Sequence, residues 1–202
     1  GARNATQGTQ LWVGGAQNGE DEIRFANGSV MNLPNGTVPD GDKNYTFIVS
    51  LDGGKTGNTE RILSSGLSSS NRQNRLTYVN TTTYAASWYG NDLQVNTVTG
   101  FAQPHNIAVT YDNTVGRAGY FNSEFVNSDN ASGRNSASTN NRIGHSSLGF
   151  TGPLFELLVY QAALSDPARN LLEQSQSANW DIELAPPGTG ATEATKAMAS
   201  DG

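Results

Sequence analysis

The feature that most constrains this chain is a series of short apolar runs separated by turns rich in glycine and asparagine. Asn18-Gly19, Asn27-Gly28 and Asn35-Gly36 are typical of these turns, because tight hairpins need residues that tolerate positive φ angles. Short apolar runs bounded in this way indicate β-strands. We expect strands in Leu11–Val13, Glu22–Ala26, Val30–Leu33, Tyr45–Leu51, Glu60–Leu63, Arg75–Val79, Tyr84–Tyr89, Leu93–Val95, Ile107–Tyr111, Ala118–Phe121 and Phe125–Val126.

Alternation within these runs predicts which face of each strand is buried. In Tyr45–Leu51, the residues at odd positions are all large and apolar, and the residues at even positions point to the opposite face. The run Ile107–Tyr111 alternates in the same way. Many short antiparallel strands followed by one late helix predict an all-β fold, a sandwich of two antiparallel sheets.

The stretch from Phe150 to Trp180 joins the most apolar run to the only convincing helix. Residues 154–163 are apolar at most positions, as in a strand that is covered on both faces. Ser165 is a good N-cap, and Asp166 and Pro167 suit the first helical turn. We expect the helix to pack on the sandwich through one face, with Trp180 as a buried plug at its end; that face comprises Ala168, Leu171, Leu172 and Ser175.

Polar segments divide the chain into three regions. Residues 1–9 are small and polar and suggest a flexible arm, residues 10–183 form the predicted sandwich, and residues 184–202 are a low-complexity tail. Within the sandwich, residues 127–141 contain no apolar side chain larger than alanine, which favours a long exposed loop.

Bulk composition excludes several classes of function. The net charge is −6 and the chain has only three lysines, so it lacks the clustered basic surface that nucleic acid requires. Without cysteine it has no disulfide framework and no thiolate chemistry. No apolar run approaches the length of about 20 residues that a membrane span needs, so we expect no membrane span.

The order of the sequence pieces resembles the laminin G-like, concanavalin A-like jelly-roll family over roughly residues 10–180. The matching pieces are Asp21-Glu-Ile-Arg-Phe, Asn44-Tyr-Thr-Phe-Ile-Val-Ser-Leu, His105-Asn-Ile-Ala-Val-Thr-Tyr-Asp, Gly116-Arg-Ala-Gly-Tyr-Phe-Asn, Ile143-Gly-His and Phe150-Thr-Gly-Pro-Leu-Phe-Glu-Leu-Leu-Val-Tyr-Gln-Ala-Ala-Leu-Ser. Asn122-Ser123 stands where the family usually has an Asn-Gly hairpin. The resemblance implies a jelly-roll sandwich and no particular activity, because this fold carries lectins, adhesion modules, glycosidases and virion parts.

The sequence argues against catalysis. Glycosidases on this sandwich need carboxylates at alternate positions of one strand, whereas residues 20–22 are consecutive acids and Glu156 stands alone. His105 opens a predicted strand and His145 lies beside a predicted turn, so we interpret both as structural or surface groups. We therefore expect no enzyme activity.

The segment Asp40-Gly-Asp42-Lys-Asn44 places three oxygen-bearing side chains at alternate positions, as at the start of a calcium loop. It then departs from that pattern, because Tyr45 replaces the glycine and Leu51 stands where the bidentate glutamate belongs. Two interpretations stay open: plain turn chemistry, which the departures favour, and bound calcium held by these three side chains. The sequence calls for no other cofactor.

A sugar site is the other candidate. Tyr84 and Trp88 share one strand face, and Tyr89, Asn91 and Asp92 follow at the strand end. An aromatic platform flanked by hydrogen-bonding groups is typical of lectin sites. The alternative for the two strand aromatics is core packing, which we favour for Trp88.

Two functions remain. The one we favour is a non-catalytic structural or assembly subunit of a virion or surface filament, which meets protein partners or copies of itself through residues 1–9 and 184–202. The alternative is an exported lectin-like module that binds glycans or proteins through its loops. Both functions predict a location outside the cell, on a cell surface or on a virion surface.

Overall fold

The computed structural model describes residues 11–53, 59–69, 71–97 and 100–184, without the side chains of residues 11–13 and 16. These residues form thirteen strands and one helix: β1 (Leu11–Gln17), β2 (Glu20–Phe25), β3 (Val30–Asn32), β4 (Tyr45–Leu51), β5 (Glu60–Gly66), β6 (Gln73–Asn80), β7 (Thr83–Ser87), β8 (Asp92–Asn96), β9 (His105–Asp112), β10 (Gly116–Phe121), β11 (Glu124–Asp129), β12 (Arg142–Gly144), β13 (Gly152–Tyr160) and α1 (Asp166–Trp180).

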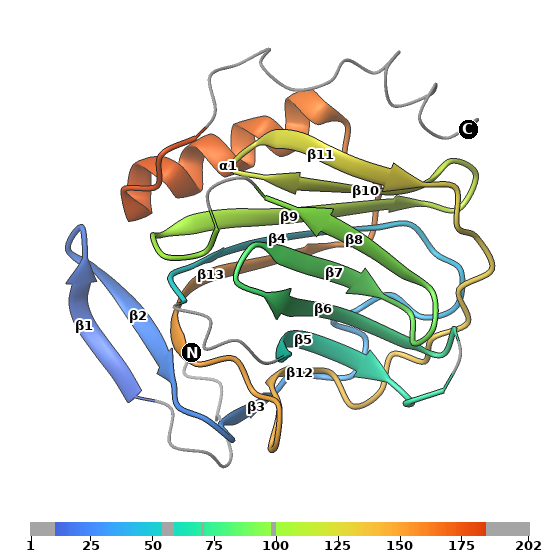
Figure 1. The fold of residues 1–202 in the computed structure, drawn as a ribbon, viewed down its shortest axis with the longest axis horizontal. Coiled ribbons are helices and arrows are strands. Elements are labelled where there is room, and N and C mark those ends of the chain that lie inside the picture. The colour runs from blue at the N-terminus through green and yellow to red at the C-terminus, as the bar shows by residue number, and fades with distance from the viewer. Residues whose placement is uncertain (1–10, 54–58, 70, 98–99, 185–202) are drawn as a thin grey trace.

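The strands form two antiparallel sheets that face each other (Figure 1). The larger sheet has the order β1-β2-β13-β4-β9-β10-β11, and the smaller sheet has the order β3-β12-β5-β6-β7-β8. The predicted all-β sandwich of two antiparallel sheets with one late helix is therefore confirmed. Among the described residues, no helix has the length and apolar character needed to cross a bilayer.

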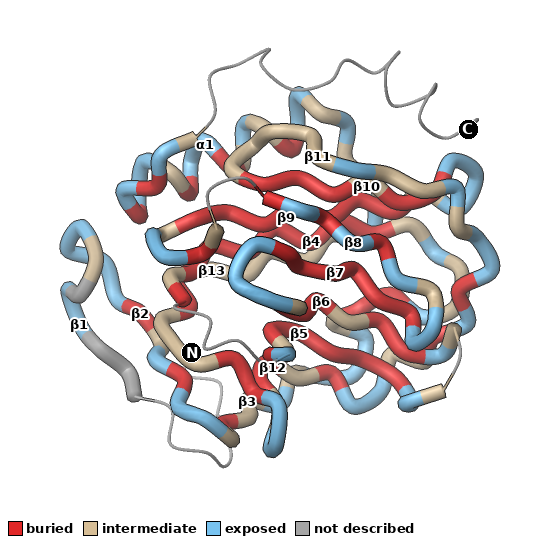
Figure 2. Tube along the Cα trace, viewed as in Figure 1, coloured by how far each residue is buried: buried red, intermediate tan, exposed pale blue. Residues whose placement is uncertain are grey.

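The core lies between the sheets, where the alternation of β4 predicted it. Tyr45, Phe47, Val49 and Leu51 are all buried in one cluster with the inward residues of the smaller sheet, such as Leu76. Ile48 points the other way and joins a second cluster on the outer face of the larger sheet. Figure 2 shows the resulting pattern, with buried backbone along the central strands and exposed loops around them.

Helix α1 packs on that outer face, but not through the predicted residues. Leu171 is 68% exposed, and only Leu172 of the predicted face packs against the sheet. The side chains that α1 buries are Arg169, Glu173, Gln176 and Trp180. Arg169 and Glu173 form an ion pair one helical turn apart, so each offsets the charge of the other in the contact.

Trp180 ends the helix as a buried plug, outside the main core. Its ring stacks on Phe155 with the centroids 5.0 Å apart, and its indole N–H donates to Glu156 at 3.3 Å. The β1–β2 hairpin reaches the same point, because the Gln17 side chain donates to the Trp180 carbonyl at 3.0 Å. The hairpin thus satisfies a carbonyl group that the helix leaves without an internal partner.

The segment after β11 is not the exposed loop that its composition predicted. β11 continues to Asp129, and Arg134 beyond it is buried. The Arg134 guanidinium donates to the carbonyl groups of Pro39 and Lys43 and lies over the ring of Tyr45. One arginine side chain therefore fastens a segment that otherwise contains only small and polar residues.

Candidate functional site

Two of the predicted sugar-binding residues lie inside the core, which corrects the expectation that they form a ligand platform. Trp88 is fully buried, with the Arg117 guanidinium 4.2 Å from its ring, and its indole N–H donates to the Tyr45 hydroxyl at 3.3 Å. Tyr84 is also fully buried, and its hydroxyl donates to the Tyr120 carbonyl at 2.8 Å. Both lie on the inner face of the smaller sheet, so they cannot reach a ligand at the surface.

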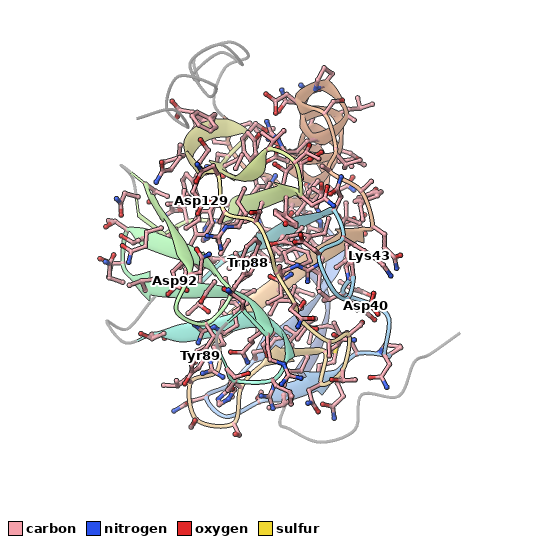
Figure 3. The ribbon with its side chains drawn as sticks, turned by 90° about the vertical axis from the view of Figure 1, so that its right-hand side faces the viewer. Asp40, Lys43, Trp88, Tyr89, Asp92 and Asp129 are labelled. Atoms are coloured by element: carbon pink, nitrogen blue, oxygen red, sulfur yellow. The ribbon has the colours of Figure 1, made fainter. Side chains whose placement is uncertain are left out.

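The other three residues lie at the end of β7 and the start of β8. The Asn91 side chain accepts from the Arg117 guanidinium at 2.9 Å, so it helps to hold a buried arginine. Tyr89 is 41% exposed, and Asp92 is exposed on the outer face of the smaller sheet. Figure 3 shows Trp88 in the interior, and Tyr89 and Asp92 on the side of the smaller sheet. Two of the five residues thus reach one surface.

The predicted calcium segment leads into β4, and its central carboxylate is occupied by protein donors. Asp42 accepts hydrogen bonds from the Tyr111 hydroxyl and from the backbone N–H groups of Gly133 and Arg134. Burial and this contact with Asp42 raise the pKa of Tyr111 above its ordinary value. Asp42 thereby ties the segment before β4 to the segment after β11.

The two neighbours of Asp42 have separate partners. Asp40 pairs with exposed Lys43, which lowers the pKa of Asp40, and Asn44 donates to Asp112 at 3.2 Å. Among the described residues, no group of three aspartate, glutamate or histidine side chains could hold a metal ion. The structure thus gives each of these three side chains a role in turn geometry, and calcium stays a prediction.

A cluster that the sequence analysis missed lies on the outer face of the smaller sheet. Arg142 of β12 lies opposite Ser64 of β5, Ser64 lies opposite Arg75 of β6, and Arg75 lies opposite Ser87 of β7. Leu76, the neighbour of Arg75, points into the core, so this row of residues points outward.

Arg61 of β5 completes the cluster, because it pairs with Thr77 two residues along from Arg75 and therefore shares its face. We call Arg61, Arg75 and Arg142 the arginine cluster. The Arg142 side chain donates to Ser64 at 3.2 Å, and the Arg75 side chain donates to Ser87, which in turn donates to Asp92.

Beside this cluster lies a cleft of about 640 Å³, which we call the arginine cleft. The loop from Ser147 to Gly149 forms one wall, and it is attached to β5 by a hydrogen bond of 2.6 Å from the Arg61 N–H to the Leu148 carbonyl. His145 shapes this loop as a neutral acceptor for the Ser147 N–H, and burial and the nearby Arg61 and Arg142 lower its pKa. The lining residues are Asn27, Thr59, Glu60, Arg61, Arg75, Ser147, Leu148, Gly149 and Thr151.

The arginine cluster carries positive charge that the described carboxylates do not neutralise directly. None of its three members forms an ion pair within the described ranges, and the Nε atoms of Arg61 and Arg75 are buried there without a hydrogen-bond acceptor. Burial lowers the pKa of Arg61, and the charges of Arg75 and Arg142 lower it further. Like charges held close together in this way favour an anionic ligand that would pair with their exposed N–H groups.

One signal in the sequence could have indicated part of this cluster. Arg75 and Arg61 each stand next to a large apolar residue of their strand, Leu76 or Ile62, that points into the core. Their convergence with Arg142 depends on the order of β12, β5 and β6 in the sheet. The alternation of residues within one strand does not predict which strands are neighbours.

No protein-family model matches the chain, and a search of curated proteins finds no significant match. Solved structures do match. The CBM40 domain of the Ruminococcus gnavus IT-sialidase, bound to α2,3-sialyllactose, is 14% identical with a TM-score of 0.63, over 81% of this chain and 98% of that chain. The leech intramolecular trans-sialidase, complexed with 2,7-anhydro-Neu5Ac, is 16% identical with a TM-score of 0.61, over 81% of this chain and 27% of that chain.

The binding domain of botulinum neurotoxin serotype G is 11% identical with a TM-score of 0.66, over 87% of this chain and 46% of that chain. This chain thus spans almost all of the bacterial CBM40 domain and less than half of the two larger proteins. At these identities the likeness shows the fold alone. It agrees with a jelly-roll β-sandwich of the kind found in carbohydrate-binding modules, and membership of the laminin G-like family stays a prediction.

Proposed function

We propose that this protein is a non-catalytic carbohydrate-binding module that recognises an acidic glycan in the arginine cleft. The observation that carries the proposal is that Arg61 and Arg75 line one cleft and Arg142 lies on the same sheet face, none of them with a carboxylate partner among the described residues. The glycan would bind through a sugar carboxylate, and a sialylated glycan is the first candidate.

The chemistry of the guanidinium group explains why a carboxylate fits. A guanidinium presents N–H donors in a planar fork that matches the two oxygens of a carboxylate. A carboxylate between Arg61 and Arg75 would reduce their mutual repulsion. A neutral sugar would not reduce that repulsion, so the cleft should discriminate by charge.

Two comparisons support this proposal. The bacterial CBM40 domain carries sialyllactose, and the leech enzyme carries a sialic acid derivative; both ligands contain a carboxylate. The glycan-binding alternative is therefore better supported than the assembly subunit that we favoured from the sequence. The assembly interpretation rests on residues 1–9 and 184–202, which lie outside the described residues except for Leu184. A glycan-binding module of this kind would act outside the cell or at a cell or virion surface.

The non-catalytic part of the proposal rests on the acids. Glu156 accepts from Trp180 beneath α1 on the outer face of the larger sheet, and Glu22 pairs with Arg24. Neither acid lines the arginine cleft. Glu60 is the one carboxylate in its lining, so the described lining lacks the pair of acids that glycoside hydrolysis requires.

Calorimetric titration with 3′-sialyllactose and with lactose tests the proposal. We expect the protein to bind 3′-sialyllactose and not lactose, and we expect Arg61→Ala and Arg75→Ala each to weaken binding about tenfold or more, as loss of a charged hydrogen bond predicts. Arg72→Ala is the matched control, because it removes the same charge from an exposed residue outside the cleft. Equal loss in all three variants, or equal binding of both sugars, would refute recognition at this cleft.

A further inference from the structure

The turn between β7 and β8 has an unusual residue at its first position. It is a two-residue hairpin turn in which Tyr89 has φ 63° and Gly90 has φ 88°, closed by a hydrogen bond of 3.0 Å from the Trp88 N–H to the Asn91 carbonyl. Two successive positive φ angles define a type I′ turn, and Asn-Gly is the sequence that this turn prefers. Here a tyrosine occupies the asparagine position.

Tyrosine is strained in this conformation, because its Cβ crowds the backbone when φ is positive. The other non-glycine residues with positive φ among the described residues are all small and polar: Asn18, Asn71, Asn122, Ser123, Asn140 and Asp181. Tyr89 is the single bulky exception in this part of the chain. Such strain persists where the surrounding structure holds it, and it is frequent at functional sites.

Core packing does not offset this strain. The Tyr89 side chain is 41% exposed, although it is an aromatic group that could bury much apolar area. Its ring lies beside the arginine cluster instead, with the Arg75 guanidinium 5.5 Å from the ring centroid. It is also close enough to Arg61 to affect the pKa of that residue.

We infer that Tyr89 is a specificity-determining residue that offers its exposed ring to the sugar whose carboxylate the arginine cluster holds. The inference rests on the proposed function, and it assigns the stacking role to Tyr89 in the turn rather than to the buried Tyr84 and Trp88. Apolar C–H groups of a sugar ring pack well on an aromatic face, so a platform beside the cations would select a pyranose acid over a bare carboxylate or inorganic anion.

The test uses one substitution that should raise the stability of the protein and weaken its binding of the sugar. Tyr89→Asn creates the favoured Asn-Gly turn, so we expect the melting temperature to rise by about 2–4 °C. We expect the same variant to bind 3′-sialyllactose about tenfold more weakly. Tyr89→Phe keeps the ring and should bind within about threefold of the original protein.

The control is the β10–β11 turn, which has the same geometry far from the cleft. Asn122 and Ser123 have φ 48° and 69°, so Ser123→Gly should also raise the melting temperature while leaving binding unchanged. If Tyr89→Asn binds as well as the original protein while Arg75→Ala does not, the platform role is refuted and the arginine site stands. If the original protein does not bind 3′-sialyllactose, the proposed function fails first.

Discussion

His105 shows how a single residue ties the pH dependence of this protein to its interior. Its imidazole is buried, and its Nδ1 atom lies 2.6 Å from the Gln103 carbonyl oxygen, which can only accept. Nδ1 therefore carries the proton, and Nε2 accepts from the Tyr78 hydroxyl at 2.7 Å. Burial lowers the pKa of His105 to about 4, against the opposing effect of the Gln103 hydrogen bond.

This shift predicts a loss of stability in mild acid. Between pH 6.5 and about 4 the unfolded chain binds a proton at His105 that the folded protein does not, so stability falls as the pH falls. The loss attributable to His105 is about 3 kcal/mol from pH 7 to pH 4, at about 1.36 kcal/mol per pKa unit. Denaturant unfolding of the original protein and of His105→Gln measures it. If the free energy of unfolding fell equally with pH in the two proteins, the prediction would be contradicted.

For single residues, the sequence predicted correctly whether a histidine is structural, but it did not predict which aromatic residue is exposed. The expectation that His105 is a structural group rather than a base agrees with its two hydrogen bonds. Trp88 and Tyr89 are adjacent after the end of β7, and the first is buried while the second is exposed because the chain turns at Tyr89, where φ is positive. Both side chains are aromatic and could form a sugar platform, and only the geometry of the turn shows which of the two is exposed.

Helix α1 illustrates the limit of periodicity at the scale of an element. Sequence rules placed its start correctly, with Ser165 before the first turn and Pro167 within it. They failed for its buried face because Arg169 and Glu173 resemble a solvent-exposed i, i+4 pair. In the structure this pair is covered by the sheet, and the Arg169 guanidinium lies 3.6 Å from the centroid of the Tyr120 ring.

The buried pair makes the polar face of α1 more sensitive to substitution than its leucines. Glu173→Ala would leave the buried Arg169 charge with only the more distant Asp166, 3.7 Å away, so we expect a cost of about 3 kcal/mol in the free energy of unfolding. Leu171→Ala, on the exposed side of the same helix, should change that free energy by no more than about 0.5 kcal/mol. Denaturant titration of both variants measures the two losses in the free energy of unfolding. A larger loss for Leu171→Ala than for Glu173→Ala would show that the leucine face is the buried one.

For the whole molecule, the distance between the two sheets depends on Gly119 of β10. A Cβ atom added at Gly119 would lie 2.3 Å from a Cγ2 atom of Val95 and 3.1 Å from the Tyr84 hydroxyl oxygen. Val95 belongs to β8 of the smaller sheet and Gly119 to the larger sheet, so the missing side chain lets the sheets approach. The φ angle of Gly119 is not in the positive range, and space alone requires glycine there.

A double-mutant cycle tests this contact. We expect Gly119→Ala to destabilise the protein by about 1–3 kcal/mol through overpacking. Val95→Ala removes the methyl group that the new Cβ would meet, so the double variant should be more stable than the sum of the two single effects by about 1 kcal/mol or more. Simple additivity in thermal or denaturant unfolding would show that the sheets adjust elsewhere.

At this scale the sequence predicted the class of fold and not the site. Strand alternation and turn residues determined two antiparallel sheets with a late helix, because those signals are local. The arginine cluster joins residues from β5, β6 and β12, and the pairing of β12 with β5 brings together segments far apart in the chain. Long-range pairing of this kind has no local signature, so the cluster emerged only with the structure.

The position of the arginine cluster also makes the molecule electrically asymmetric. The net charge is −6, and the cluster gathers three of the twelve lysine and arginine residues on one face of the smaller sheet. A negatively charged surface would repel most of this protein and attract the face of the smaller sheet. The protein would therefore approach such a surface in one preferred orientation. Added salt would lower the association rate constant more than it would raise the dissociation rate constant.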